Sequence, residues 1–143
     1  MENTYDVIIV GAGPAGMTAA IYAIRANMKV LMLDRLSPGG VIIDTAEIEN
    51  YTGAGKLTGA ELAIKMFEHT QELGVEFDYR TVIDLIDEGE WKIVVCEEDD
   101  AVYQAKAVIL ATGTVPRRLG VPGEDQWAGS GISWCAICDG AQY

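Results

Sequence analysis

Cysteine and histidine are scarce in this sequence. Its 143 residues include three cysteines, Cys96, Cys135 and Cys138, and one histidine, His69. A small and odd number of cysteines argues against the disulfide framework of a small secreted protein. A structural zinc site needs four thiolate or imidazole ligands, and neither Cys96 nor His69 has ligand-like spacing to the close pair at 135 and 138. We therefore expect no metal site, and we interpret the pair as redox chemistry.

Basic residues are also few, and long apolar segments are missing. Ten lysines and arginines stand against 22 acidic residues, which gives a formal net charge of −12. Such a surface repels a phosphate backbone, so nucleic acid is not an expected partner. The longest apolar runs, residues 7–10 and 107–111, are too short to cross a bilayer. The N-terminus carries acid where a secretory signal carries Lys or Arg. We expect a soluble, cytoplasmic protein that does not span a membrane.

The composition is that of a globular domain, with 50% hydrophobic and 22% charged residues. Residues 5–10 are apolar without alternation, which predicts a strand buried on both faces. A glycine-rich turn follows, then a predicted helix over 17–27 and a second buried strand over 29–33. These segments form one βαβ unit. A further helix is predicted over 60–73, capped by Thr58 or Gly59.

The second half of the chain predicts mostly strands. A short strand is expected at 75–77, and polar turns then separate three antiparallel strands at 79–85, 90–96 and 101–104. A buried parallel strand is predicted over 106–111. Pro116 and Pro122 break the regular pattern and mark a linker.

The glycine-rich turn has the spacing Gly11-x-Gly13-x-x-Gly16 between a predicted strand and a predicted helix, which is the context of a dinucleotide-binding loop. Gly11 permits the tight turn, Gly13 lets a pyrophosphate approach the backbone, and Gly16 lets the helix pack on the strand. The helix N-terminus offers N–H groups to the phosphates. Asp34, 21 residues after Gly13, can accept hydrogen bonds from ribose hydroxyls and would repel a 2′-phosphate. The loop alone does not separate FAD from NAD.

The segment Cys135-Ala136-Ile137-Cys138-Asp139-Gly140 carries the second motif. Two thiols at this spacing can close a small disulfide ring and exchange it with a substrate disulfide. The carboxyl group of Asp139 can move the protons that this exchange requires. The alternative is a reduced pair buried as small apolar residues. Cys96 lies in a predicted strand, where we expect a structural bystander.

Together these segments resemble the low-molecular-weight, bacterial-type thioredoxin reductases over nearly the whole chain. The matching segments occur in the family's order: residues 7–16, 38–40, 49–53, 111–113, 122–124 and 131–140. The resemblance implies an α/β fold, the Rossmann-like FAD-binding three-layer ββα fold with an antiparallel β-meander, incomplete at the C-terminus. Residues 1–115 would be the first portion of the FAD-binding domain. Residues 116–143 would be a linker and the opening of the pyridine-nucleotide domain, which bears the cysteine pair.

The resemblance also implies an electron path from NADPH to FAD, to the Cys135/Cys138 disulfide and then to thioredoxin or a thioredoxin-like protein. Cys138 would face the flavin, Cys135 would attack the substrate disulfide, and Asp139 would be the acid/base. The residues implied in FAD binding are Gly11, Gly13, Pro14, Ala15, Gly16, Asp34, Arg35, Gly39, Gly40, Asn50, Ala111, Thr112 and Gly113. The full-length protein is expected to be a homodimer.

Three positions depart from the family pattern: Asp34 replaces a common Glu, Val41 a common Gln, and Trp134 a common Tyr or Phe. The family's second glycine-rich loop, which binds NADPH, and its C-terminal FAD segment do not occur in this sequence. We therefore expect an N-terminal fragment without turnover of its own. Alternatives are a related flavoprotein that uses ferredoxin or acts as a dithiol oxidase, and an FAD-binding module without turnover. The electron donor and the disulfide substrate stay open.

Overall fold

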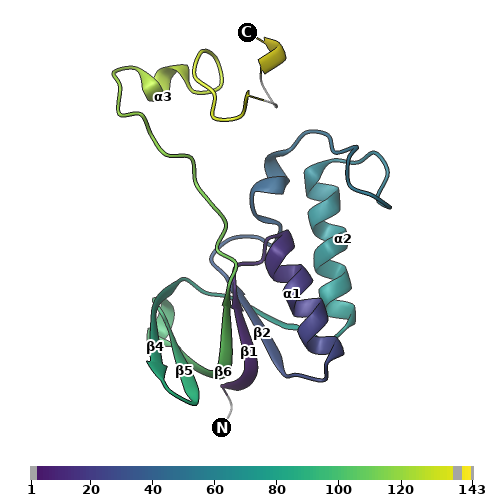
Figure 1. Ribbon diagram of the computed structural model, residues 1–143, viewed down its shortest axis with the longest axis vertical. Coiled ribbons are helices and arrows are strands. Elements are labelled where there is room, and N and C mark those ends of the chain that lie inside the picture. Colours follow the sequence, from purple (N-terminus) through teal and green to yellow (C-terminus); the bar gives the residue numbers. More distant parts are fainter. Residues whose placement is uncertain (1–2, 137–139, 143) are drawn as a thin grey trace. The chain divides into compact units, whose positions relative to one another are not determined.

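The computed structural model describes residues 3–136 and 140–142, and the chain divides into two compact units, Met1–Gly113 and Thr114–Tyr143. The first unit contains one six-stranded sheet with the strand order β3-β2-β1-β6-β5-β4 (Figure 1). The strands are β1 Thr4–Val10, β2 Val30–Asp34, β3 Glu76–Tyr79, β4 Val82–Glu88, β5 Trp91–Cys96 and β6 Val102–Leu110. Parallel pairs join β3, β2, β1 and β6, and antiparallel pairs join β6, β5 and β4.

The strand β6 belongs to both parts of this sheet. Its first residues pair antiparallel with β5, from Val102 to Ala105, and its residues from Gln104 to Leu110 pair parallel with β1. The prediction of two separate strands at 101–104 and 106–111 is therefore wrong. The polar residue Lys106 does not interrupt the strand, because its ammonium group reaches solvent and the carboxylate of Asp6 in β1 at 2.8 Å.

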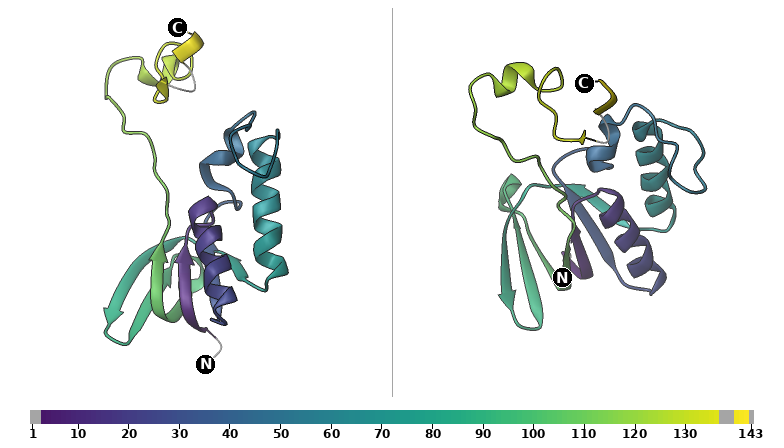
Figure 2. Two further views of the ribbon diagram at one scale, coloured as in Figure 1. Left: turned by 45° about the vertical axis from the view of Figure 1, so that its right-hand side comes forward. Right: turned by 45° about the horizontal axis from the view of Figure 1, so that its top comes forward.

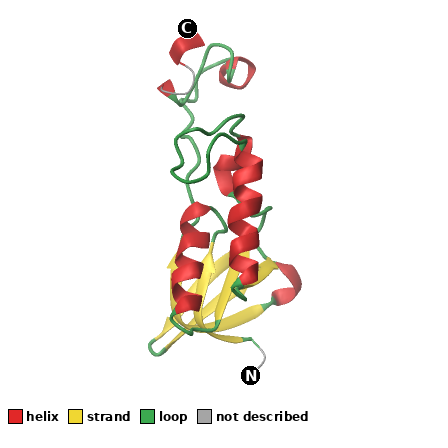
Figure 3. Cartoon of the chain, turned by 90° about the vertical axis from the view of Figure 1, so that its right-hand side faces the viewer, coloured by secondary structure: helices red, strands yellow, loops and turns green. Residues whose placement is uncertain are grey.

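Two helices cover one face of the parallel strands. They are α1 Pro14–Arg25 and α2 Gly59–Glu72, and Figure 3 shows them side by side over the sheet. The core on this side contains Val7 and Ile9 of β1, Met17 of α1 and Met32 of β2. Every second residue of these strands faces the helices, and the burial of these apolar side chains favours folding.

The antiparallel strands cover the opposite face, so that Figure 2 shows the β4–β5 hairpin and the helices on opposite sides of β1. Ile8 of β1 and Leu31 of β2 pack here against Val94 of β5 and Tyr103 of β6. The side chains of the consecutive residues Ile8 and Ile9 lie on opposite faces of the sheet, and both are 0% exposed. Because β1 and β2 are buried on both faces, their sequences are unbroken apolar runs. The predicted three-layer ββα fold is confirmed.

The helix boundaries follow local capping chemistry. The first helix begins at Pro14, three residues before the predicted start, because proline fits the first helical position, where its missing N–H costs nothing. The second helix has the capping box that Thr58 offers: its hydroxyl accepts from the Glu61 N–H at 3.2 Å, and Glu61 accepts from the Thr58 N–H at 2.7 Å. Gly74, with φ of +88°, ends this helix as predicted.

Other segments differ from the sequence-based expectation. The irregular stretch after residue 37 contains a 3-10 helix, Gly40–Asp44. The strand predicted at 79–85 is divided: Tyr79 ends β3, where it pairs with Asp34, and Val82 begins β4. Within the described ranges, no helix has the length and apolarity needed to traverse a bilayer.

The second unit contains the short helix α3 Glu124–Trp127 and a 3-10 helix at Gly140–Gln142, in the region 116–143 where a linker and the opening of the nucleotide domain were predicted. The carboxylate of Glu124 is buried and accepts the backbone N–H groups of Leu119 at 2.9 Å and Gly120 at 2.8 Å. A buried carboxylate that accepts two backbone donors is satisfied without a cation. A bridge between Ala128 and Ile132 closes the turn that follows.

Candidate functional site

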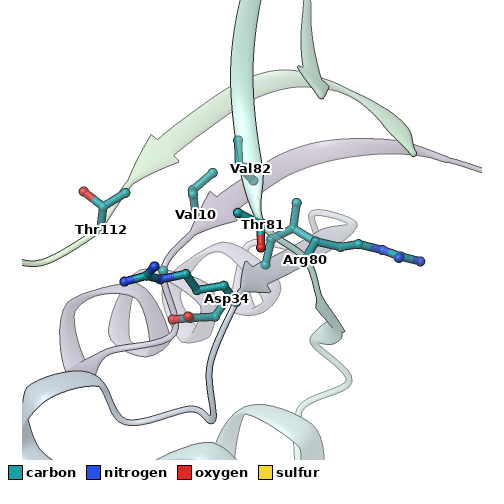
Figure 4. Close-up of a pocket in the computed structure, with 9 residues that line it drawn as sticks. Val10, Asp34, Arg80, Thr81, Val82 and Thr112 are labelled. Carbon is teal, nitrogen blue, oxygen red and sulfur yellow. The ribbon is translucent and has the colours of Figure 1, made fainter. Parts of the chain in front are cut away.

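A cavity of about 350 Å³ lies where the carboxyl ends of the parallel strands meet (Figure 4). In open α/β sheets this edge is the usual position of the ligand. The cavity is lined by Val10, Gly11, Leu33, Asp34, Arg35, Arg80, Thr81, Val82 and Thr112. Four of these, Gly11, Asp34, Arg35 and Thr112, are among the predicted cofactor-binding residues. The other five were not identified from the sequence.

Gly11 holds the strand ends together at the floor of the cavity. Its φ is +109°, and its N–H donates to the carbonyl of Leu33 at 2.8 Å. A Cβ atom at this position would lie 2.2 Å from the carbonyl oxygen of Ala111, the residue that follows β6. Both the dihedral angle and this close backbone approach exclude a side chain. The motif's first glycine therefore permits the turn and also the passage of β6 beside it.

Gly16 and Gly13 have different surroundings. A Cβ at Gly16 would lie 1.8 Å from the carbonyl oxygen of Gly11, so that helix α1 can pack on the loop only with glycine there. Gly13 has an ordinary φ of −76°, and a Cβ built on it would have no neighbour among the described residues within 4 Å. The space beside Gly13 is open. This is the approach that a pyrophosphate group needs.

The N-terminus of α1 can hold an anion. Among the described residues, no side chain caps it, whereas Thr58 and Glu61 cap α2. Pro14 has no N–H, so the backbone donors that face outward from the first turn belong to Ala15 and Gly16. Donors without a capping partner at a helix N-terminus favour a bound phosphate. Pro14 and Ala15, which were predicted in the glycine-rich turn, thus form the first residues of the helix.

Asp34 ties the loop to the end of β2. Its Oδ2 accepts the N–H of Ala12 at 2.7 Å, and its Oδ1 accepts the N–H of Leu36 at 3.0 Å. Two carboxylate oxygens provide about four acceptor positions. These two bonds therefore leave capacity for the hydroxyl groups of a ribose. The structure adds a fold-stabilising contact that sequence reasoning did not anticipate.

The turn at Gly39 and Gly40 lies against the glycine-rich loop. The N–H of Gly39 donates to the carbonyl of Ala12 at 2.8 Å, and a Cβ on Gly40 would lie 3.4 Å from the Cα of Gly13. Their φ values, +132° and +59°, favour glycine. The structure thus brings together two glycine turns that are more than 20 residues apart in the sequence.

Asn50, Ala111 and Gly113 occupy other places. Asn50 is exposed in a loop that the Ile48–Leu57 bridge closes, and it does not line the cavity. Ala111 donates its N–H to the carbonyl of Val10 at 2.8 Å and so continues the contact between β6 and β1. Gly113, with φ of +71°, is the last residue of the first unit.

The cysteine motif lies in the second unit. Cys135 is half-buried and its sulfur is disulfide-bonded. Its N–H donates to Ser133 Oγ at 3.0 Å, and that hydroxyl donates to the Cys135 carbonyl at 3.3 Å. The predicted residues Cys138 and Asp139 lie outside the described residues. In the portion of the chain that the structure describes, no group of three or more His, Cys, Asp or Glu side chains could hold a metal ion.

Cys96 has the surroundings of a structural residue. It lies in β5 with 1% exposure and belongs to the core beneath the antiparallel strands. Burial raises the pKa of its thiol, and the nearby Glu98 carboxylate raises it further. A buried thiol with a raised pKa is a poor nucleophile.

Comparison with known proteins gives one family and many close relatives. The family model described as pyridine nucleotide-disulphide oxidoreductase matches residues 5–143. The thioredoxin reductase of Bacillus subtilis is 49% identical over 142 residues, and the match covers 99% of this chain and 44% of that protein. The thioredoxin reductase of Listeria innocua is 46% identical with the same coverage. The chain therefore spans less than half the length of these curated relatives.

Solved structures of thioredoxin reductases are also similar to this chain. The thioredoxin reductase of Lactococcus lactis is 47% identical with a TM-score of 0.81, over 97% of this chain and 45% of that one. A ferredoxin-flavin thioredoxin reductase from Clostridium acetobutylicum is 31% identical with a TM-score of 0.74, over 98% of this chain and 48% of that one. The resemblance that the sequence motifs indicated is confirmed.

Proposed function

This chain belongs to the pyridine nucleotide-disulphide oxidoreductase family, and we propose that it is the N-terminal portion of an FAD-dependent thioredoxin-disulfide reductase. The observation that carries the proposal is the cavity at the strand ends. The carboxylate of Asp34 lines this cavity, and the glycine-rich loop that continues from its lining residue Gly11 adds an open backbone at Gly13 and uncapped helix donors at Ala15 and Gly16. These groups fit the pyrophosphate and ribose of a dinucleotide.

In this proposal the adenosine diphosphate half of FAD lies on the glycine-rich loop, with Asp34 and Arg35 beside the ribose and Thr112 at the end of β6. The flavin half would extend past Gly39 and Gly40 toward Asn50. Bound FAD supplies two-electron transfer between a nicotinamide and a disulfide. The binding site for NADPH would lie in a part of the protein beyond this sequence. Residues 1–115 would form the first portion of the FAD domain, and residues 116–143 the opening of the nucleotide domain.

The cysteine pair would carry the electrons onward. Two electrons and two protons convert the Cys135–Cys138 disulfide into two thiols. The Cys135 thiolate would then attack a substrate disulfide, forming a mixed disulfide and releasing one substrate thiol, and Cys138 would displace the second. The Cys pair is oxidised again and the substrate is reduced. Asp139 would accept and return protons, and Cys138 would be the sulfur nearer the flavin. Thioredoxin is the proposed partner, a homodimer the proposed assembly, and the cytoplasm the proposed location.

A second candidate differs only in the electron donor. The similarity to a ferredoxin-flavin thioredoxin reductase, with 31% identity over 98% of this chain, favours it. The cavity and the cysteine pair would have the same roles in both proteins, because both would pass electrons from a flavin to a disulfide. The donor would be recognised by residues beyond this sequence.

Anaerobic spectroscopy of the full-length protein separates the candidates. We expect flavin absorbance in the purified protein, bleaching when NADPH is added, and recovery when oxidised thioredoxin follows. Bleaching by reduced ferredoxin but not by NADPH would favour the second candidate. A protein without flavin absorbance, or one whose reduced flavin thioredoxin does not reoxidise, would contradict the proposed function.

A further inference from the structure

A polar cluster lies behind one wall of the cavity, and the proposed function does not use it. The Nε of Arg80 donates to Asp78 Oδ2 at 3.0 Å and to the Tyr103 hydroxyl at 3.1 Å, and that hydroxyl donates to Asp78 Oδ2 at 2.8 Å. Burial raises the pKa of Tyr103, so its hydroxyl keeps the proton that it donates. The cluster thus joins the end of β3 to β6 through three mutually consistent hydrogen bonds.

Arg80 also forms part of the cavity wall with Thr81 and Val82. Its backbone N–H donates to the carbonyl of Asp34 at 3.0 Å, at the end of β2. Its guanidinium group does not face the cavity: Figure 4 shows the Arg80 side chain directed away from Asp34 and Thr112. The side chain is 23% exposed. Arg80 therefore contributes its backbone to the cavity and its charge to the cluster behind it.

The cavity wall at residues 80–82 contains the connection between β3 and β4. Residues 80 and 81 belong to no strand, yet they link β3 and β4, which lie at opposite ends of the strand order. So short a link is possible because the antiparallel strands fold back over the parallel ones. Thr81 is held from the other side, since its N–H donates to both carboxylate oxygens of Glu98 at 3.1 and 2.9 Å. The link also keeps one backbone bond on each side, from the Arg80 N–H to Asp34 and from the Glu97 N–H to the Thr81 carbonyl at 2.9 Å, and the side chains of Arg80 and Glu98 reinforce them.

We propose that Arg80 is a positioning residue for the adenosine end of the dinucleotide. Its bonds to Asp78 and Tyr103 fix the 80–82 wall at its distance from Asp34, and so shape the cavity without touching the ligand. The inference rests on the proposed function, because it takes FAD as the occupant. Loss of the guanidinium group would leave Tyr103 bonded to Asp78, but the wall would lose its tie to both.

The test uses the full-length protein freed of flavin and titrated with FAD and with FMN, which lacks the adenosine half. Arg80→Met keeps the aliphatic stem and removes the charged donors. We expect the dissociation constant of FAD to rise about tenfold, as for one lost charge-assisted bond, and that of FMN to stay unchanged. Arg80→Lys should recover part of the loss, because an ammonium group can still donate to Asp78. Arg25→Met, at the exposed end of α1, is the matched control and should bind FAD normally.

Tyr103→Phe removes one hydroxyl without altering the packed ring, and it should weaken FAD in the same direction by about threefold. If Arg80→Met does not fold, Tyr103→Phe still tests the same hydrogen-bonded cluster. Normal FAD affinity in the Arg80 and Tyr103 variants, or an equal loss of FAD and FMN, would overturn the positioning role. Failure of the proposed function gives a different result: FAD would then remain bound in Gly13→Val, whose added side chain fills the open space beside the glycine-rich loop.

Discussion

Replacement of Gly13 by valine should release FAD from the full-length protein and leave its fold intact. A Cβ at this position meets no described atom within 4 Å, and the φ of −76° is open to every residue. The cost to the fold is the less favourable N-cap, about 1 kcal/mol. The cost to the ligand is larger, because the valine methyl groups would occupy the space where the pyrophosphate meets the N–H groups of Ala15 and Gly16.

The size of the binding loss follows from those two donors. Charge-assisted hydrogen bonds contribute about 1.5–3 kcal/mol each, so the loss of two weakens binding by roughly 10²- to 10⁴-fold. Gly16→Ala should behave in the opposite way. Its Cβ would lie 1.8 Å from the backbone oxygen of Gly11, a contact that only movement of α1 can relieve. We expect a loss of about 3 kcal/mol or more in the free energy of unfolding.

The assay compares Gly13→Ala, Gly13→Val and Gly16→Ala. Flavin content after gel filtration measures retention, and urea denaturation of the flavin-free proteins measures stability. The two alanine variants are a matched pair, since they add the same methyl group three residues apart. If Gly13→Val retained flavin in full, the loop would not be the FAD site. If Gly16→Ala were as stable as the wild-type protein, the packing argument would be refuted.

Three further predictions address other parts of the molecule. Cys96→Ser should leave the disulfide-reductase activity of the full-length protein largely intact, and a loss as large as that of Cys138→Ser would contradict a structural role. Thr58→Ala should lower the free energy of unfolding by about 1 kcal/mol in urea through loss of its cap on Glu61, with unchanged flavin content. Hydrogen bonds from the backbone N–H of Thr81 lower the pKa of Glu98. The stabilisation that these hydrogen bonds give to the cavity wall should therefore be fully present above the ordinary pKa of glutamate. It should be lost as the pH falls through the lowered pKa of Glu98 in the folded protein. FAD titrations at a series of acidic pH values should show this pH-dependent loss of FAD affinity in the wild-type protein and not in Glu98→Gln.

The first βαβ unit could be predicted because its signals are local. The apolar run before Gly11, the glycine spacing and Asp34 lie within 35 residues, and each follows from backbone or hydrogen-bond chemistry at one place. The capping of α2 by Thr58 is local in the same way. For such segments the pattern of residues determines the element and its ends.

The errors occurred where structure depends on partners distant in sequence. Nothing near Lys106 indicates that one strand pairs with β5 and then with β1. Likewise, the wall formed by Arg80 and Thr81 depends on Tyr103 and on Glu98, which lie 23 and 17 residues further along the chain. The only sequence signal was a polar pair inside a predicted strand, and its meaning becomes clear only from the fold.

In the proposed relay, electrons pass from the flavin to Cys138, the inner cysteine, and then to Cys135, the outer one. Full-length Cys135→Ser and Cys138→Ser proteins should be reduced and examined for the long-wavelength charge-transfer band of a thiolate beside a flavin. We expect the band in Cys135→Ser, where the inner thiol Cys138 remains, and its absence in Cys138→Ser. The opposite pattern would reverse the two roles, and no band in either protein would contradict the proposed relay.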